Sequence, residues 1–201
     1  MDSIGSARRS ATVERRTRET EVVVRLALNG RGECAADTGI GFLDHMLELL
    51  SAHGNLDLEV RAQGDLQTGA HHTVEDVGIC LGTALAQALG DKAGIARYGS
   101  FLLPMDESLA LVALDLSGRP HLVYDVNLTN VSVGGFDTDL AVEFFQAVVN
   151  NARLTLHVRM LAGGNPHHMI EAIFKGFGRA LAQAASPDAR IAGVPSTKGV
   201  L

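Results

Sequence analysis

The chain has 201 residues, of which 46% are hydrophobic and 20% are charged, a composition typical of a packed globular protein. Its net charge of −6, with histidine counted as neutral, argues against a general binder of nucleic acids or acidic membranes. The two cysteines are too few for a disulfide framework, and no apolar run approaches the roughly 18 residues of a membrane span, so we expect a protein of the reducing cytoplasm.

The predicted elements of the first part of the chain follow one another as strand, strand, helix, strand, helix. Residues 19–28 alternate between polar and apolar side chains and turn at "NG", which predicts a strand, and "ECAADT" is expected to pair back. "GFLDHMLELLSAHG" carries apolar residues at helical spacing and closes on Gly54, so it predicts a helix. "LDLEVRA" predicts a strand, and residues 71–89 predict a long helix ended by Gly90.

The second part of the chain repeats this order. "ESLALVALDLSGRP" alternates and turns at "SG", "DLAVEFFQAVVNNA" predicts a helix, "LTLHVRM" a strand, and "PHHMIEAIFKGFGRALAQAA" a helix that opens with proline. Three motif pairs recur at similar offsets: "LALNGRG" and "LDLSGRP" at 114 − 26 = 88, "LDLEV" and "LTLHV" at 154 − 56 = 98, and "HHTVE" and "HHMIE" at 167 − 71 = 96. Offsets this similar indicate an internal duplication.

The duplication predicts an α+β fold in which each half holds a mostly antiparallel sheet with two helices on one face. We expect one compact domain made of a disordered polar arm at residues 1–12, a first half-repeat at residues 13–94 and a second at residues 95–201.

The two copies of a His-His-x-x-Glu motif open the two equivalent long helices. The copies are His71, His72 and Glu75 in the first half, and His167, His168 and Glu171 in the second. Neighbouring histidines on a helix point about 100° apart, so one motif alone makes a poor three-ligand site. We expect each of two metal ions to take one histidine from each motif plus a carboxylate, provided that the copies meet within one chain or across a subunit contact.

Two further ligands are suggested on the helices that precede the motifs. His45 lies in "FLDHM", and Glu143 in "VEFF" occupies the same place in the second half, since 143 − 45 = 98. The set contains imidazoles and carboxylates but no thiolate, which favours Mn, Fe, Co, Ni or Zn over Cu(I), Mg or Ca.

An anion site is the other signal in the sequence. "PSTKG", which contains Ser196 and Lys198, offers two hydroxyls, a lysine and a flexible backbone that could wrap an anion. Arg97 and Arg119 could complete such a site, because a guanidinium binds phosphate through two hydrogen bonds. A loose basic tail and solvated turn arginines are the alternative interpretation.

The motifs together resemble the imidazoleglycerol-phosphate dehydratase family, lyases of histidine biosynthesis. The resemblance rests on "FLDHML", "HHTVEDVGICLGTAL", "MDESL", "DLSGRP", "LTLHVR", "NPHHMIEA", "FKGFGRAL" and "PSTKGVL", and it runs from about Val13 to Leu201. It implies a ribosomal protein S5 domain 2-like fold, with helices packed between two sheets. It also implies two Mn²⁺ ions per active site and a 24-subunit homo-oligomer built from trimers, with sites completed at subunit interfaces.

The resemblance also assigns roles to residues of this chain. The implied metal ligands are His45, His71, His72, Glu75, Glu143, His167, His168 and Glu171. The implied phosphate contacts are Arg97, Arg119, Lys175, Ser196 and Lys198. Glu19 occupies the family's position for a catalytic acid/base beside Glu171, and Glu143 stands where many members of the family have histidine.

The implied reaction removes water from imidazole glycerol phosphate and gives imidazole acetol phosphate. The proton that is lost sits on a carbon without a neighbouring carbonyl, so the ring must supply the electrons. Metal ions on both ring nitrogens would hold the ring as imidazolate, because cations lower the pKa of bound ligands. Two rival functions remain open: a dimetal phosphohydrolase, which would release inorganic phosphate, and a non-enzymatic metal-binding assembly.

Overall fold

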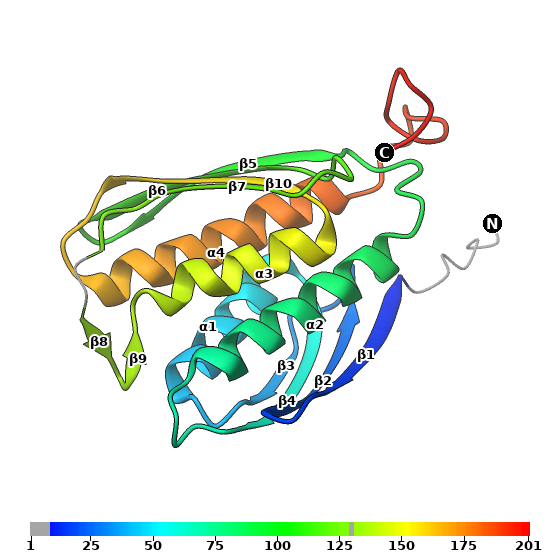
Figure 1. Cartoon of the computed structure of the whole chain (residues 1–201). Helices are drawn as coiled ribbons and strands as arrows, with labels where there is room; N and C mark the ends of the chain where they lie inside the picture. Colours follow the sequence, from blue (N-terminus) through cyan, green and yellow to red (C-terminus); the bar gives the residue numbers. More distant parts are fainter. Residues whose placement is uncertain (1–8, 129–130) are drawn as a thin grey trace.

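The computed structural model of the chain describes residues 9–128 and 131–201. Within these residues the molecule has three layers: two sheets lie on the outside, and four helices fill the space between them (Figure 1). None of these helices combines the length and the apolar character that a membrane crossing requires.

The two halves supply the same order of elements, apart from one small added hairpin. The first half contains β1 (Ser10–Arg16), β2 (Thr20–Ala27), β3 (Cys34–Asp37), α1 (Gly41–Gly54), β4 (Asp57–Gly64) and α2 (His71–Leu89). The second contains β5 (Tyr98–Met105), β6 (Ser108–Asp115), β7 (His121–Asp125), the hairpin β8 (Ser132–Val133) and β9 (Phe136–Asp137), α3 (Leu140–Ala152), β10 (Thr155–Ala162) and α4 (Pro166–Ala185).

The two main sheets have the same topology. Their strand orders are β1-β2-β4-β3 and β5-β6-β10-β7, and in each sheet only the last strand pairs in parallel. The registers repeat as well: Ser10 pairs with Ala27 and Tyr98 with Asp115, a displacement of 98 − 10 = 115 − 27 = 88. The duplicated α+β fold predicted from the motif offsets is therefore confirmed.

The central strands show why the sheets carry helices on one face only. Along β6, buried residues alternate with partly exposed ones over the whole strand, as expected when one face meets the core. In β2 the buried residues Val22 and Val24 lie at the positions that Ala110 and Val112 occupy in β6. Both sheets therefore turn their apolar faces inward, towards the helices.

Each helix packs on its own sheet and also against a helix of the other half, α1 against α4 and α2 against α3. The close approach depends on two equivalent glycines. A Cβ on Gly178 would lie 2.7 Å from the carbonyl oxygen of Leu50, and a Cβ on Gly82 would lie 2.6 Å from that of Val148. Because 178 − 82 = 96 and 148 − 50 = 98, the two helix pairs are related by the same duplication as the motifs.

Helix ends follow the sequence signals. α4 begins with Pro166 after Asn165, whose side-chain oxygen accepts a hydrogen bond from the backbone N–H of His167. α1 and α3 both end on a left-handed residue, Asn55 with φ 50° and Arg153 with φ 52°. Asparagine adopts this conformation readily whereas arginine rarely does, and Arg153 is held there by a hydrogen bond from its Nε to the Gly118 carbonyl.

The sequence patterns missed the strands β1 and β5 and the small hairpin of β8 and β9, and they assigned β3 the wrong partner. Residues 10–12 of the predicted arm belong to β1, and β5 is its counterpart in the second half. Both are edge strands, which need few buried side chains and so leave little pattern. "ECAADT" forms β3, but it pairs in parallel with β4 rather than back onto β2. Residues 1–8 of the predicted arm lie outside the described residues.

Candidate metal and anion sites

The start of α4 carries a compact group of three potential metal ligands. His45 from α1, His167 and Glu171 place one ligand atom each within 4.8 Å of the others. His167 Nε2 lies 3.1 Å from Glu171 Oε2, and His45 Nε2 lies 3.9 Å from the same oxygen. Two imidazoles and a carboxylate suit a divalent transition metal, and ligand atoms on one such ion are commonly about 3 Å apart. The residues present therefore fit a metal ion.

Glu171 is the most enclosed member of this group. It is 7% exposed, and Lys175, one turn further along α4, pairs with its other carboxylate oxygen. Burial acts to raise the pKa of Glu171, but the Lys175 ammonium and the nearby His167 outweigh it, so the pKa lies below its ordinary value. Glu171 is therefore charged and already neutralised by a cation before any metal binds.

His168 faces a different carboxylate from its neighbour. Its Nδ1 lies 2.9 Å from Glu107 Oε2, on the turn between β5 and β6, and 3.8 Å from Asp106. The hydrogen bond with Glu107 raises the pKa of His168, and the same contact, with a bond from the backbone N–H of Asn165, lowers the pKa of Glu107 to about 2.

In the first half, His72 of α2 also meets a carboxylate from outside its motif. Its Nδ1 lies 3.1 Å from both oxygens of Asp65, and this contact raises the pKa of His72. Loss of solvent around Asp65 acts to raise its pKa, but the hydrogen bonds with His72 and Thr68 together outweigh this, so the pKa of Asp65 is lowered. On the other side of the ring, Nε2 lies 4.0 Å from Glu19 Oε1. His71 lies beside His72 with its ring nearly perpendicular, at a centroid distance of 6.1 Å.

The expectation that each metal takes one histidine from each motif is not met within one chain. The only clusters of three ligand atoms within 4.8 Å among the described residues are His45-His167-Glu171 and Asp106-Glu107-His168, and neither mixes the motifs. His45 also joins the second motif rather than the first. The reason is the helix packing, which pairs α1 with α4 across the two halves. Glu75 and Glu143 belong to no such cluster.

Four of the five predicted phosphate contacts do come together. Arg97, Arg119, Ser196 and Lys198 line one hollow of about 740 Å³, formed by the turn after β6 and the end of the chain. Arg97 donates from Nε and Nη2 to Asp115, and from Nη1 to the carbonyl of Pro195. These bonds use three of the five N–H groups of the guanidinium, so two remain for an anion. Arg97 also anchors the tail that brings Ser196 and Lys198.

The fifth predicted contact, Lys175, lies elsewhere, beside Glu171 at the candidate metal cluster. The two places are far apart in one chain. The backbone N–H of Arg97 donates to the carbonyl of Ala184 at the end of α4, whereas His167 stands at its start. The 17 residues between them span about 25 Å at 1.5 Å per residue, and Figure 1 shows the tail and the start of α4 at opposite ends of the molecule. No small phosphate ester can reach both places in one chain.

The motifs alone did not point to the carboxylates that hold the second histidines, Asp65 and Glu107. One signal could have found Glu107. It stands 107 − 19 = 88 residues after Glu19, the offset that relates the strands on either side, so it is the counterpart of the predicted acid/base. Asp65 has Gly163 at its own equivalent position (163 − 65 = 98), so the repeat gives no hint of it.

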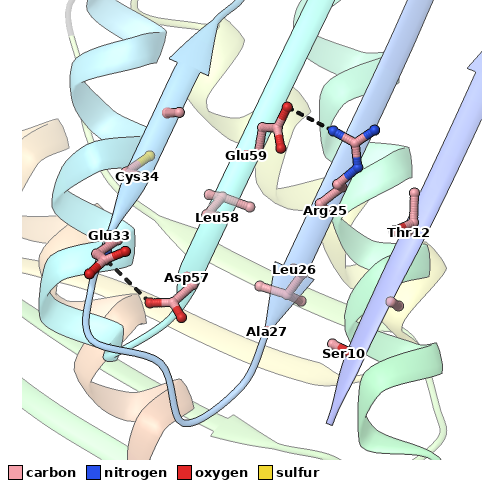
Figure 2. Close-up of a pocket in the computed structure, with 12 residues that line it drawn as sticks. Ser10, Thr12, Arg25, Leu26, Ala27, Glu33, Cys34, Asp57, Leu58 and Glu59 are labelled. Carbon is pink, nitrogen blue, oxygen red and sulfur yellow. Dashed lines mark hydrogen bonds and ion pairs between the residues drawn. The ribbon is translucent and has the colours of Figure 1, made fainter. Parts of the chain in front are cut away.

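A second hollow of about 660 Å³ lies on the outer face of the first sheet, over β1, β2, β4 and the start of β3 (Figure 2). None of the predicted site residues lines it. Its charged groups satisfy one another: Arg25 Nη1 lies 2.7 Å from Glu59 Oε1, and Asp57 accepts hydrogen bonds from the backbone N–H groups of Arg31 and Glu33. These charged side chains are bonded to one another or to the backbone, and they do not point together at one open position as the groups of a catalytic site do.

Fold and sites together define a duplicated α+β protein with candidate metal ligands at one end of its helices and a candidate anion pocket at the other. Comparisons with known proteins identify the family within this class. The model of the family described as "Imidazoleglycerol-phosphate dehydratase" matches residues 38–181. The protein of that description from Desulforamulus reducens is 58% identical over 193 residues, which cover 96% of this chain and 98% of the relative. The one from Synechococcus elongatus is 58% identical over 198 residues, covering 98% and 95%.

Solved structures agree with the sequence comparisons. The crystal structure of imidazoleglycerol-phosphate dehydratase from Staphylococcus aureus superposes with a TM-score of 0.81 at 44% identity, covering 89% of this chain and 99% of that one. The enzyme from Pyrococcus furiosus, in complex with (S)-C348, superposes with a TM-score of 0.82 at 37% identity, covering 94% and 100%. The chain therefore belongs to the imidazoleglycerol-phosphate dehydratase family, as the motifs predicted.

Proposed function

We propose that the chain is a hydro-lyase that converts imidazole glycerol phosphate to imidazole acetol phosphate and water, leaving the phosphate ester intact. The observation that carries the proposal is the pairing of imidazole–carboxylate clusters with a separate pocket of Arg97, Arg119, Ser196 and Lys198, in a chain of this family. The clusters suit a metal-bound heterocycle, and the pocket suits a phosphate group.

The proposed metal ligands are divided between two related sites. One site takes His45, His167 and Glu171, and the duplication relates these to Glu143, His71 and Glu75, by offsets of 98, 96 and 96. His72 and His168 complete the sites, and Mn²⁺ is the proposed ion. When bound, such cations would lower the pKa of the substrate's imidazole ring, so that the ring could release electron density.

We propose that each active site combines residues from different copies of the chain, in a 24-subunit homo-oligomer built from trimers. The support is the distance of about 25 Å along α4 between its metal ligands and the anion pocket. A second copy must bring its pocket, or its other motif, to complete each site. The free Cys34 and Cys80 support the cytoplasm as the compartment where this assembly works.

Glu19 and Glu171 are the proposed proton-transfer groups. Glu19 stands on the turn between β1 and β2, where its backbone N–H donates to Thr17 Oγ1. Its carboxylate is exposed and lies near His72 Nε2, so it can approach a substrate held beside that histidine. Glu171 is already charged and paired with Lys175, and it must exchange that partner to accept a proton. Lys175 can therefore affect when Glu171 is available, and its predicted contact with phosphate depends on the second copy that completes the site.

The decisive experiment is to incubate Mn-loaded protein with imidazole glycerol phosphate and to measure the ketone product and free phosphate separately. A dehydratase forms the ketone and no inorganic phosphate, whereas a dimetal phosphohydrolase releases phosphate. A protein that only stores metal gives neither product.

The residue-level part of the proposal has its own test. Glu19→Gln should keep the affinity for Mn²⁺ and for inorganic phosphate but lower turnover by about 10²–10⁴-fold, the usual contribution of a positioned acid or base. Turnover close to that of the unmodified protein would remove Glu19 from the mechanism.

A further inference from the structure

Glu19 and Glu107 are counterparts in the duplicated fold but have different surroundings. Each is the last residue before the second strand of its sheet, Thr20 in β2 and Ser108 in β6, and 107 − 19 = 108 − 20 = 88. The same offset relates the strand registers on either side. If the two glutamates did the same work, their carboxylates would have similar contacts.

The Glu107 carboxylate is fully engaged by the second half of the chain. Its Oε1 accepts hydrogen bonds from the backbone N–H of Asn165 at 2.9 Å and from the hydroxyl of Ser108 at 3.1 Å. Its Oε2 lies 2.9 Å from His168 Nδ1. Because Asn165 also caps α4, this carboxylate is tied both to the start of the helix and to one of its histidines.

The Glu19 carboxylate has none of these ties. Among the described residues it accepts no hydrogen bond, and its nearest charged partner is His72 Nε2 at 4.0 Å. The hydroxyl of Thr20, the counterpart of Ser108, turns away to Asp76 of α2. The contact on the Nδ1 side of His72 comes from Asp65 instead. The two halves thus hold their second histidine by the same ring atom but with carboxylates from different elements.

A carboxylate at this distance fixes which nitrogen of the ring can bind a metal. An ionised carboxylate only accepts hydrogen bonds, so Nδ1 must carry the proton and Nε2 keeps the lone pair for a metal ion. Such carboxylate–histidine contacts orient the ring and raise its basicity as a ligand.

We propose that Glu107 is a positioning residue that holds His168 with Nε2 ready for metal, and that Asp65 does the same for His72. Because Asp65 has this role in the first half, Glu19 is free to move a proton, a role that its counterpart Glu107 does not share. The proposal rests on the dehydratase function and on the metal ligands proposed above.

Glu107 is unsuited to two other roles. As a direct ligand in the Asp106-Glu107-His168 cluster, it would have to release three donors that it already serves. As a second acid/base, it would have to break the same bonds during each turnover.

The test is to titrate the assembled, metal-free protein with Mn²⁺ by calorimetry, without substrate, and then to measure kcat and KM at saturating Mn²⁺. Glu107→Ala should weaken one class of Mn²⁺ sites by about 10–100-fold, and Asp65→Ala the other class by a similar factor. Glu107→Gln keeps one hydrogen-bond acceptor, so its Mn²⁺ affinity should lie between those of Glu107→Ala and the unmodified protein. Asp91→Asn, an exposed residue just beyond the end of α2 that lies opposite its histidines, is the control and should bind Mn²⁺ normally.

Once Mn²⁺ saturates, Glu107→Ala should regain most of its kcat, whereas Glu19→Gln should stay slow at every Mn²⁺ concentration. Loss of kcat at saturating Mn²⁺ with unchanged Mn²⁺ affinity would make Glu107 an acid/base and overturn the proposal. If Glu107→Ala binds one Mn²⁺ ion fewer per site than the unmodified protein, Glu107 is a direct ligand, and the proposal is overturned as well.

Two further outcomes remain distinguishable. If Glu107→Ala fails to fold, Ser108→Ala removes only one donor to the same carboxylate and should weaken Mn²⁺ binding less; no change in either Glu107→Gln or Ser108→Ala would overturn the proposal. If the unmodified protein binds Mn²⁺ but forms no ketone, the dehydratase function fails, while the Mn²⁺ affinities still report on Glu107 and Asp65.

Discussion

The glutamates of the two His-His-x-x-Glu motifs, Glu75 and Glu171, occupy equivalent helical positions but meet different neighbours. Glu171 is buried beside Lys175, and the position corresponding to Lys175 in α2 is Ile79, since 175 − 96 = 79. Glu75 is exposed at the start of its helix. The duplication therefore repeats the ligand atoms but not their electrostatic setting, so the two proposed metal sites should differ in affinity and in their effect on stability.

The arginines at the other end of the helices show the same kind of difference. Arg97 and Arg119 have Arg9 and Arg31 as counterparts, each 88 residues earlier. The first-half pair lacks Asp115, which is replaced by Ala27 at that offset, whereas residues near the end of the chain line the hollow at Arg97 and Arg119. Arg9 donates instead to the side chain of Asn29. The proposed anion pocket therefore depends on Asp115 and the tail as well as on a pair of arginines.

The largest expected effect comes from removing the motif glutamates. Glu171→Ala should lower turnover by about 10²–10⁴-fold, because it removes a proposed proton-transfer group. Glu75→Ala should also lower turnover, because it removes a proposed metal ligand. Only Glu171→Ala should also lower the free energy of unfolding, by about 1–3 kcal/mol, since it leaves the largely buried Lys175 ammonium without its partner. Denaturant unfolding measures the difference in stability loss between the two variants. Equal losses would mean that the electrostatic surroundings of Glu75 and Glu171 are equivalent.

The arginine pairs should differ in substrate binding. Arg119→Ala should raise KM by about 10–100-fold with little change in kcat, as expected for one lost bond to a charged phosphate. Its counterpart Arg31→Ala is the control and should leave KM unchanged. Steady-state kinetics at constant ionic strength provide the measurement. A similar rise in KM for Arg31→Ala would indicate a second anion site and would mean that the two arginine pairs do not differ in function.

The halves should behave alike where their backbones meet. Gly82→Ala and Gly178→Ala should each cost about 1–3 kcal/mol of stability, because both insert a methyl group against a carbonyl oxygen of the facing helix. Gly41→Ala, with no atom within 4 Å of the added Cβ, is the control and should be close to neutral. Thermal unfolding reports all three. A large difference between the first two would show that the helix pairs are not equivalent.

The smallest expected effect lies in the outer groove, whose ion pair belongs to the first half. Arg25 and Glu59 correspond to Ala113 and His157, at offsets of 88 and 98, so the second sheet has no such ion pair. Arg25→Ala should change the free energy of unfolding by less than about 1 kcal/mol, as expected of an exposed ion pair, and should leave turnover unchanged. A marked loss of turnover would show that this face contributes to the active assembly.

Much of the fold could be predicted from local patterns. The bounds of α1, α2 and α4 agree with "GFLDHMLELLSAHG", residues 71–89 and "PHHMIEAIFKGFGRALAQAA", because apolar spacing and glycine or proline at the ends mark a helix within its own segment. The partner of β3 could not be predicted, since parallel pairing with β4 depends on a crossover through α1 and not on the four residues of the strand.

The sequence by itself determined the duplication and the types of ligand, because repeated spacing and side-chain chemistry are written in the order of residues. Only the tertiary structure decided which of these residues meet. His45 joins His167 and Glu171 because small glycines let α1 approach α4 of the other half. Arg97 reaches the tail because the end of α4 brings them together. Such contacts join residues distant in sequence, and their geometry depends on how whole elements pack, which no local pattern contains.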